Sequence, residues 1–288
     1  MIHLENEHLS VTIHPKGAEL QILSRKDTGI NYLWKADPAW WGKHSPVLFP
    51  IIGTLKDNTY IFDGKSYTLP RHGFARDKTF GAVQAGGEEA VFTLKDDEDT
   101  RAVYPFAFEF RVRYRLTGPE LEVRYEVLNP ASAPLYFSVG GHPAFAVPLD
   151  APNRYEDYYL LFSQPETAGR WPLQDGLLEP EATPFLQDSQ KIALTHELFA
   201  ADAIVLQGLR SDSVTLKSDK SGHGLRFSIK GWPDLGIWAA PGSPFVCIEP
   251  WQGHADYVNH DQQLLHKEGI VELAAAGEWA RSWKVELF

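Results

Sequence analysis

Three side chains suited to proton transfer stand in unusual settings in this sequence, and Glu249 is the first of them. It is the only carboxylate in the apolar run Phe245–Trp251, a pattern that predicts a buried strand. An ionised carboxylate in apolar surroundings is costly unless a partner stabilises it or a reaction uses it. The alternative is a residue that ends the strand and points to water, since isolated acidic residues at strand ends are common. Two other places in the chain favour the functional interpretation.

Both of these places are histidines beside glycines, where backbone can turn tightly and approach a ligand. His72 precedes Gly73, and His142 follows two glycines and precedes Pro143, which restricts His142 to extended backbone. Taken singly, each histidine is more simply a turn residue bonded to a nearby carbonyl. Taken with Glu249, they suit general acid/base catalysis near neutral pH, with imidazole as the acid and carboxylate as the base.

Other chemistries have less support in the residue pattern. The two histidines lack the short spacing of zinc ligand pairs, and the single cysteine, Cys247, lies among apolar residues as a packed thiol would, so we expect no metal. His254 and His260 form a weak candidate ligand pair. No G-x-S-x-G elbow, G-x-G-x-x-G fingerprint or P-loop occurs, and neither a serine triad nor a nucleotide cofactor is therefore predicted.

Composition narrows the class of partner. The net charge of −11, from 38 acidic and 27 basic residues, opposes non-specific binding to nucleic acid or to an anionic membrane surface. The sequence begins with neither a basic nor an apolar targeting segment, and no run approaches membrane-spanning length. With one cysteine and no internal disulfide, we expect a cytoplasmic protein that binds a small molecule.

Short alternating segments with turn residues between them predict the fold. Residues 8–14 and 18–23 read as a hairpin, and residues 106–116 and 121–128 form the clearest long hairpin. Further strands are predicted at 59–62, 66–69, 79–84, 90–94, 203–206, 213–217, 224–230, 235–239, 245–248, 271–273 and 282–287. With 288 residues, no linker and no repeat, we expect an all-β protein: one large antiparallel β-sandwich domain over residues 1–288, with a few short helices.

Some segments interrupt this pattern. Asp37–Gly42 carries cap, proline and stop signals for a helix of one turn, and Thr195–Phe199 is the other helical candidate. The apolar, proline-bounded segment Pro46–Gly53 suits a covered edge or a loop that lines a cavity. We interpret the acidic run Asp96–Asp99 as a solvated loop tip, and residues 150–190 as long connections with short strands.

Several of the nine tryptophans lie beside these motifs, and flat aromatic faces suit the apolar faces of sugar rings. Trp251, two residues after Glu249, is a candidate sugar contact. Most of the others are expected to fill the core; those near the motifs are Trp40, Trp41, Trp232 and Trp238.

A family resemblance is carried by motifs that span nearly the whole chain: Phe49–Gly53 with Leu55–Asp57, Pro70–Asp77, Gly141–Phe145, Asp202 and Cys247–Gly253. In these residues and in their order, the sequence resembles the aldose 1-epimerases (galactose mutarotases), and especially their LacX-like branch of small bacterial members. The resemblance implies a galactose mutarotase-like β-sandwich with a cleft on one sheet face, a sugar substrate and no cofactor.

The resemblance also implies roles for individual residues. Glu249 matches the base that removes the proton of the anomeric hydroxyl, and His142 matches the acid that protonates the ring oxygen. After rotation about C1–C2, reclosure with exchanged duties gives the other anomer. His72 matches the histidine that holds the substrate, and Asp202 matches the acidic residue that bonds sugar hydroxyls.

Arg76 and Lys56 are further candidate contacts. The sequence departs from the family at Thr54, because related sequences commonly carry an arginine directly after the glycine that aligns with Gly53. A substrate contact is therefore in question there, and Lys56 is a candidate to replace part of it.

Four functions follow as hypotheses. The first is a mutarotase acting on a free aldohexose. A hexose-6-phosphate 1-epimerase is the next, because Arg71, Arg76 and Lys78 could contribute to a phosphate site. A non-catalytic sugar-binding or regulatory module is opposed by the presence of both an acid and a base. A glycosidase would need Glu249 and Asp202 as its two carboxylates, and nothing else marks Asp202 as the required acid.

Overall fold

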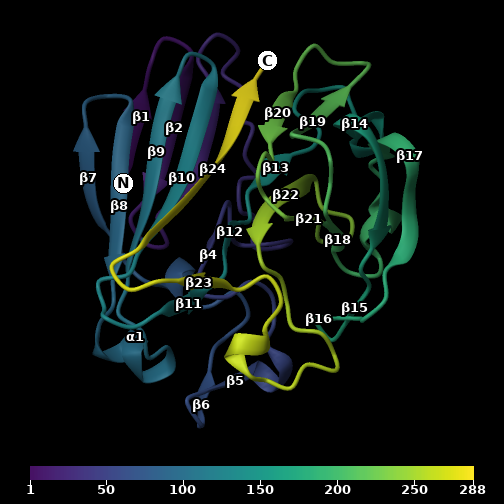
Figure 1. The fold of residues 1–288 in the computed structure, drawn as a ribbon. Helices are drawn as coiled ribbons and strands as arrows, with labels where there is room; N and C mark the ends of the chain where they lie inside the picture. Colours follow the sequence, from purple (N-terminus) through teal and green to yellow (C-terminus); the bar gives the residue numbers. More distant parts are fainter.

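Two large antiparallel sheets dominate the computed structural model, which describes residues 1–288 (Figure 1). The nine-stranded sheet contains, in spatial order, β17 (Thr183–Ala193), β14 (Tyr158–Arg170), β19 (Ser213–Ser218), β20 (Leu225–Ser228), β24 (Glu278–Leu287), β10 (Glu120–Leu128), β9 (Glu109–Thr117), β8 (Glu89–Lys95) and β7 (Gly81–Ala85). The six-stranded sheet contains β18 (Ile204–Gln207), β21 (Asp234–Trp238), β22 (Phe245–Gln252), β12 (Val139–Gly141) and β4 (Val47–Leu48), with β13 (Ala144–Ala146) paired to β22.

Smaller elements complete the protein. One sheet of three strands contains β1 (Ile2–Glu5), β2 (Leu9–His14) and β3 (Glu19–Arg25), and the two-stranded units are β5 (Thr59–Phe62) with β6 (Lys65–Thr68), β11 (Leu135–Phe137) with β23 (Val271–Leu273), and β15 (Leu173–Gln174) with β16 (Leu177–Leu178). The helices are short: α1 (Glu98–Val103) and the 3₁₀ turns η1 (Lys56–Asn58), η2 (Ala75–Asp77), η3 (Tyr155–Asp157), η4 (His196–Phe199) and η5 (Leu264–His266). None of them has the length and apolar character needed to cross a membrane.

Period-two alternation explains how the sheets pack. In β9 and β10, buried and partly exposed residues alternate along strands that pair antiparallel over their full length. The two large sheets contact each other through aromatic side chains. The Phe49 ring, just after β4, stacks on Phe110 of β9 at 4.5 Å, and Phe145 of β13 meets Phe227 of β20 at 5.8 Å.

The structure confirms the predicted sandwich and most of its strands. Both predicted hairpins form, as β2–β3 and β9–β10, and the apolar segment 46–53 supplies β4, the edge of the six-stranded sheet. The short helical candidate at Thr195–Phe199 is the 3₁₀ turn η4, although the Thr195 side chain forms no cap hydrogen bond.

Three element predictions are wrong. Asp37–Gly42 is a hydrogen-bonded turn rather than a helix, in which the amides of Trp40 and Trp41 both donate to the Asp37 carbonyl. The acidic run 96–99 leads into α1, because Asp97 and Thr100 form a reciprocal capping box. Residues 150–190 contain the long strands β14 and β17, which pair at one edge of the nine-stranded sheet.

The contact between Phe49 and Phe110 gives a test of the inter-sheet packing. Both side chains are fully buried, so Phe110→Ala should lower the free energy of unfolding by about 3–5 kcal/mol, from lost burial and the cavity left behind. Urea denaturation followed by circular dichroism measures this change. Val83→Ala on β7, where the side chain is 71% exposed, is the control and should shift stability by less than about 0.5 kcal/mol.

Candidate active site

One cavity of about 320 Å³ opens on the six-stranded sheet and gathers most of the predicted functional residues. The catalytic candidates Glu249, His142 and His72 all line it, as do the predicted contacts Asp202, Arg76 and Trp251. The remaining lining residues are Trp41, Gly53, Arg71, Leu173, Gly176, Leu178, Ala203, Val205, Trp238, His254 and Ala255. Segments far apart in the sequence therefore converge on one site.

Strand alternation directs Glu249 into this cavity. Along β22 the side chains of Cys247, Glu249 and Trp251 point to one face, while those between them point to the other. Opposite Glu249 in register stands Gly236 of β21, and the absence of a side chain there leaves room over the sheet. The carboxylate, 1% exposed, is thus buried at the centre of the sheet but faces a cavity.

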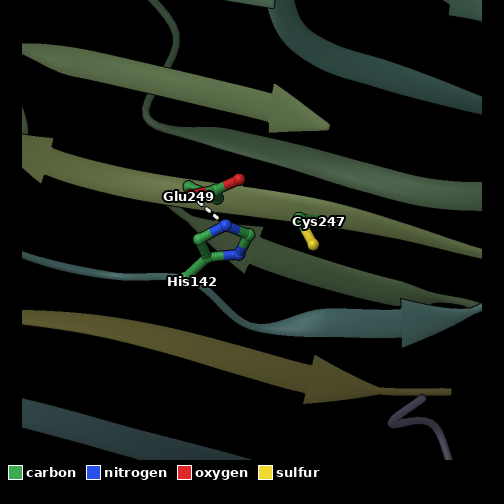
Figure 2. A group of neighbouring side chains, drawn as sticks. All are labelled: His142, Cys247 and Glu249. Atoms are coloured by element: carbon green, nitrogen blue, oxygen red, sulfur yellow. Dashed lines mark ion pairs between the residues drawn. The ribbon is translucent and has the colours of Figure 1, made fainter. Parts of the chain in front are cut away.

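His142 meets Glu249 across this face (Figure 2). Its Nε2 lies 3.4 Å from Oε2 of Glu249, and neither that oxygen nor Nδ1 of His142 has a hydrogen-bond partner in the protein. Burial raises the pKa of Glu249 well above its usual value, a rise that the charge of Arg71 and the indole N–H of Trp251 oppose. Burial likewise lowers the pKa of His142, to about 3. The apolar surroundings therefore disfavour charge on both members of the pair.

Aromatic contacts fix the orientation of the His142 ring. Trp41 stacks on the imidazole with ring centroids 4.8 Å apart and an interplanar angle of 28°, and Trp238 meets it edge-on at 5.7 Å. The backbone is also held, because the His142 amide donates to the Pro46 carbonyl. The turn at residues 37–42 therefore supplies a wall of the site.

His72 has left-handed backbone, and a hydrogen bond from the Gly53 amide fixes the tautomer of its ring. Its φ of 69° and that of Gly73, 71°, are both left-handed. Its amide donates to the Gly53 carbonyl at 2.8 Å, and its Nδ1 accepts from the Gly53 amide at 3.1 Å. Burial and the nearby charges of His142 and the arginines lower the pKa of His72 well below its ordinary value. Because Nδ1 is an acceptor in a neutral ring, Nε2 carries the proton and can donate to a ligand.

Asp202 lies at the cavity wall on a residue with left-handed backbone, φ 70°. Its Oδ1 accepts from the Ala203 amide at 2.7 Å, and Arg170 donates to its carbonyl at 2.8 Å. The loop before β18 is therefore anchored, which leaves the second carboxylate oxygen available for hydroxyl groups.

Trp251 lies flat over two glycines. A Cβ on Gly236 or Gly140 would come within 2.4 Å and 2.8 Å of its indole ring, so the ring needs both positions to lack side chains. Its Nε1 is buried and has no hydrogen-bond partner. The indole thus offers the cavity an aromatic face, while its N–H lies near Glu249 and favours the charged carboxylate.

Two arginines reach the cavity, and one of them is unpaired. Arg76 donates to the Arg71 carbonyl and lies near Asp77, whereas the Arg71 guanidinium has no hydrogen-bond or ion-pair partner. Arg71 lies beside Thr54, since a Cβ built on Gly176 would be 2.8 Å from Thr54 Oγ1 and 3.6 Å from Arg71 Nη1. A guanidinium is therefore present next to Thr54, the position at which the sequence departs from the motif it resembles.

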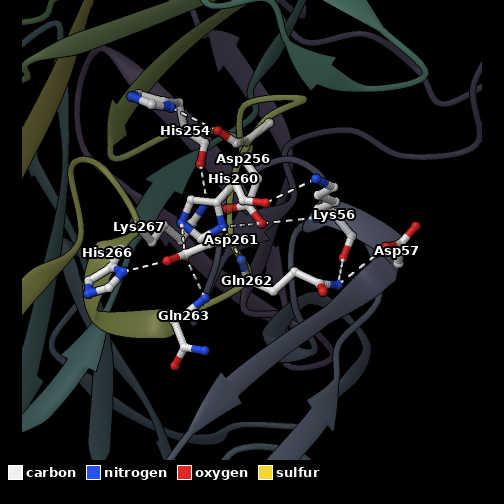
Figure 3. Close-up of polar contacts among 11 residues, drawn as sticks. Lys56, Asp57, His254, Asp256, His260, Asp261, Gln262, Gln263, His266 and Lys267 are labelled. Carbon is white, nitrogen blue, oxygen red and sulfur yellow. Dashed lines mark hydrogen bonds and ion pairs between the residues drawn. The ribbon is translucent and has the colours of Figure 1, made fainter.

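Among the predicted contacts, Lys78 does not reach the cavity and pairs instead with Asp97 and Asp99. Lys56 does not reach the cavity either. Its Nζ donates to the His260 carbonyl at 3.1 Å, and its amide donates to Asp256 at 2.9 Å (Figure 3). Its position is explained by this local support rather than by access to a ligand.

The one cluster of side chains that could bind a metal ion is poorly suited to do so. Ligand atoms of His142, Cys247 and Glu249 lie within 4.8 Å of one another (Figure 2). Burial and the neighbouring Glu249 raise the pKa of the Cys247 thiol well above its usual value, and a protonated thiol is not a ligand. The predicted packed thiol is confirmed, and the cluster fits proton transfer better than metal binding.

Two residues of the site lie outside the predicted set, His254 and the supporting Arg170. His254, predicted only as a weak metal-ligand partner of His260, lines the cavity and is buried. Its place immediately after the motif Cys247–Gly253 is a signal that could have indicated it. No local pattern marks Arg170, which acts through carbonyls on a distant loop.

The fold and the site together are a β-sandwich with a buried carboxylate and two histidines in a cavity on one sheet face. Residues 1–270 match the family model described as aldose 1-epimerase, and the chain belongs to this family. The chromosomal and plasmid LacX proteins of Lactococcus lactis subsp. lactis are each 34% identical to this chain over 99% of both sequences.

Solved structures agree with this assignment. A galactose mutarotase related enzyme from Lactobacillus acidophilus is 38% identical, with a TM-score of 0.96 over 100% of this chain and 97% of that one. A galactose mutarotase-like protein from Lactobacillus casei is 31% identical, with a TM-score of 0.91 over the whole of both chains. The resemblance drawn from the sequence is confirmed.

The backbone at His72 gives a test of how the site is built. Gly73→Ala would place a Cβ 2.3 Å from the Phe49 carbonyl oxygen at a φ of 71°, so it should cost clearly more than the ~1–2 kcal/mol of a left-handed alanine and displace His72. Thermal unfolding and ¹⁵N shifts of the His72 ring measure the two effects. Gly86→Ala is a matched control, because its φ is also 71° but nothing lies within 4 Å of the added Cβ. Equal losses in the two variants would contradict the steric argument.

Proposed function

We propose that this protein interconverts the α and β anomers of an aldohexose by general acid/base ring opening and reclosure. The observation that carries the proposal is the buried pair of Glu249 and His142, 3.4 Å apart on a cavity wall, with unpartnered atoms on both side chains. Membership of the aldose 1-epimerase family supports the reaction class.

In the proposed reaction, Glu249 takes the proton of the anomeric hydroxyl. The C1–O1 bond becomes a carbonyl, the C1–O5 bond breaks with its electron pair going to the ring oxygen, and His142 donates a proton to that oxygen. Rotation about C1–C2 presents the other face of the aldehyde. The reverse steps, with the acid and base exchanged, then close the ring as the other anomer.

The proposed reaction starts from the charged form of the pair, a carboxylate with an imidazolium, whereas burial favours the uncharged form, a carboxylic acid with an imidazole. A carboxylate with an imidazolium and a carboxylic acid with an imidazole contain the same number of protons and the same net charge. One proton can therefore enter at Glu249 while another leaves from His142 without a change in the charge of the buried site. His72, neutral with its proton on Nε2, can donate to the oxygen that develops negative charge.

Hexose 6-phosphate is the second candidate substrate, and the unpaired guanidinium of Arg71 is the observation that favours it. A phosphate needs several donors that converge on one spot, and Arg71 with Arg76 offers two at the cavity. Asp202 and Glu249 line the same cavity and would oppose a dianion nearby. We therefore rank the free sugar first.

Removal of the base should abolish catalysis. Glu249→Gln keeps the size of the side chain but cannot accept the proton, so the catalysed rate should fall by about 100-fold or more. Polarimetry of fresh α-D-galactose and α-D-glucose, corrected for the spontaneous reaction, measures this rate. Glu272→Gln on β23, which is exposed and outside the cavity, is the matched control and should retain the wild-type rate. Full activity in Glu249→Gln would displace Glu249 as the base.

The wild-type protein also decides between catalysis and simple binding. If the protein accelerates neither the mutarotation of the two free sugars nor that of glucose 6-phosphate, which is followed by NMR anomer exchange, a non-catalytic sugar-binding module is favoured. A preference for glucose 6-phosphate that Arg71→Gln removes, with KM raised by about 10-fold or more, would favour the phosphorylated substrate instead.

Arg71 should also set the pH range of activity. Its positive charge lowers the pKa of Glu249 and that of His142, so Arg71→Gln should raise both. The active form of the pair holds one proton; activity is lost on the acid limb when the pair gains a second proton and on the alkaline limb when it loses the first. With both pKa values raised, both limbs should move to higher pH. Profiles of kcat/KM measure the shift. Arg226→Gln on β20, an exposed residue paired with Glu286, should leave the profile in place, and an unmoved profile in Arg71→Gln would contradict the assigned electrostatic effect.

A further inference from the structure

A third histidine lines the cavity and has no part in the proposed chemistry. His254 follows β22, is 3% exposed, and forms a T-shaped pair with Tyr257, with ring centroids 5.4 Å apart. Apart from the bond of its Nδ1 to the Ala255 carbonyl, at 2.9 Å, its ring forms no hydrogen bond within the protein. A buried imidazole with one free nitrogen at a ligand cavity requires an explanation.

The tautomer of His254 follows from that single bond. A carbonyl oxygen only accepts, so Nδ1 carries the proton and Nε2 presents a lone pair. Burial lowers the pKa of His254 to about 4, which keeps the ring neutral near pH 7. In Figure 3 the ring extends away from the neighbouring polar cluster, with the second nitrogen at its outer end. His254 is therefore a hydrogen-bond acceptor without charge.

A buried ion pair holds His254 in place. Lys267 Nζ donates both to the His254 carbonyl and to Asp256 Oδ1, each at 2.7 Å, and Lys267 and Asp256 are 3% and 2% exposed (Figure 3). The other oxygen of Asp256 accepts from the Lys56 amide, and the Asp256 amide donates to the Thr54 carbonyl at 3.0 Å. This segment is therefore tied to the cavity wall by bonds that do not use Nε2 of His254.

His254 and His72 have opposite polarity across one close backbone contact. A Cβ on Gly53 would lie 2.5 Å from the Cβ of Ala255, so the segments that carry the two histidines touch at this point. His72 uses Nδ1 as an acceptor and offers Nε2–H, whereas His254 uses Nδ1–H as a donor and offers the Nε2 lone pair. The pair can discriminate the donor and acceptor sides of sugar hydroxyl groups.

We propose that His254 is a specificity-determining residue whose Nε2 accepts a hydrogen bond from one hydroxyl group of the sugar. The inference rests on the proposed function for the identity of the ligand. A neutral acceptor bonds a sugar hydroxyl but cannot bond the hydrogen that replaces it in a deoxy sugar, or a hydroxyl that points the other way in an epimer. Unlike the carboxylates of Glu249 and Asp202, it does not attract cations. Loss of this one bond should cost about 10- to 100-fold in affinity, because a buried acceptor is left unpaired.

Deoxy sugars provide the test. The sugar that binds best, and its 2-, 3-, 4- and 6-deoxy analogues, are titrated by calorimetry into the full-length wild type and into His254→Phe. In the wild type one analogue should bind about 10- to 100-fold more weakly than the parent. His254→Phe should bind the parent and that analogue equally, while the penalties for the other analogues stay unchanged. Equal weakening for every analogue, or no weakening at all, would overturn the proposal.

A second variant and a spectroscopic readout guard against misfolding. His254→Gln keeps a neutral acceptor and should recover part of the lost discrimination. In the wild type, two-bond ¹H–¹⁵N spectra should show an unprotonated Nε2 whose shift moves when the sugar binds, and an unmoved signal at saturation would overturn the assignment. For catalysed sugars, His254→Phe should raise KM with kcat little changed.

The two proposals fail in different ways. Sugar binding that depends on His254, without acceleration of mutarotation, would refute only the proposed reaction. Acceleration with no dependence on His254 would refute only the specificity role. If no sugar binds, both are refuted.

Discussion

The burial of one carboxylate, Glu249, on a central strand of the six-stranded sheet is the constraint on which the rest of this site depends. Glu249 is 1% exposed, and burial disfavours its charged form. Neighbouring groups offset part of this cost. His142 lies 3.4 Å away, and Arg71 and the Trp251 indole N–H stabilise the charged carboxylate. A site that stabilises the carboxylate only in part keeps it basic, and a base in an apolar cavity is what proton abstraction from a sugar hydroxyl requires.

Backbone positions without side chains create the space for this arrangement. Gly236 and Gly140 accommodate the indole of Trp251, and Gly73 allows the chain to pass against the Phe49 carbonyl and set His72. The left-handed residues at 72 and 202 are both at the cavity. Such backbone costs about 1–3 kcal/mol per residue and persists where the surrounding structure holds it, which agrees with the bonds to Gly53 and Arg170.

The sequence predicted the parts of the fold and site that have local signatures. Glu249 can be recognised because the residues around it are apolar on both faces of the strand, so its carboxylate is buried whichever face it occupies. His72 and His142 can be recognised by the glycines beside them. β17 was missed because it lies at a sheet edge and is mostly exposed, so it shows no alternation. The tautomers of His72 and His254 could not be predicted, since each depends on a backbone group that folding brings into position.

Two buried pairs of an acidic and a basic side chain differ in how completely their polar atoms are hydrogen-bonded. Lys267 and Asp256 use their polar atoms in short bonds to each other and to backbone, which makes them a support that a ligand cannot enter. Glu249 and His142 lie farther apart, at 3.4 Å, and keep Oε2 and Nδ1 unpaired, with the unpaired Trp251 Nε1 beside them. Native proteins rarely leave buried polar atoms without partners. Three such atoms, on Glu249, His142 and Trp251, belong to residues that line one cavity, where a polyhydroxylated ring would supply both donors and acceptors.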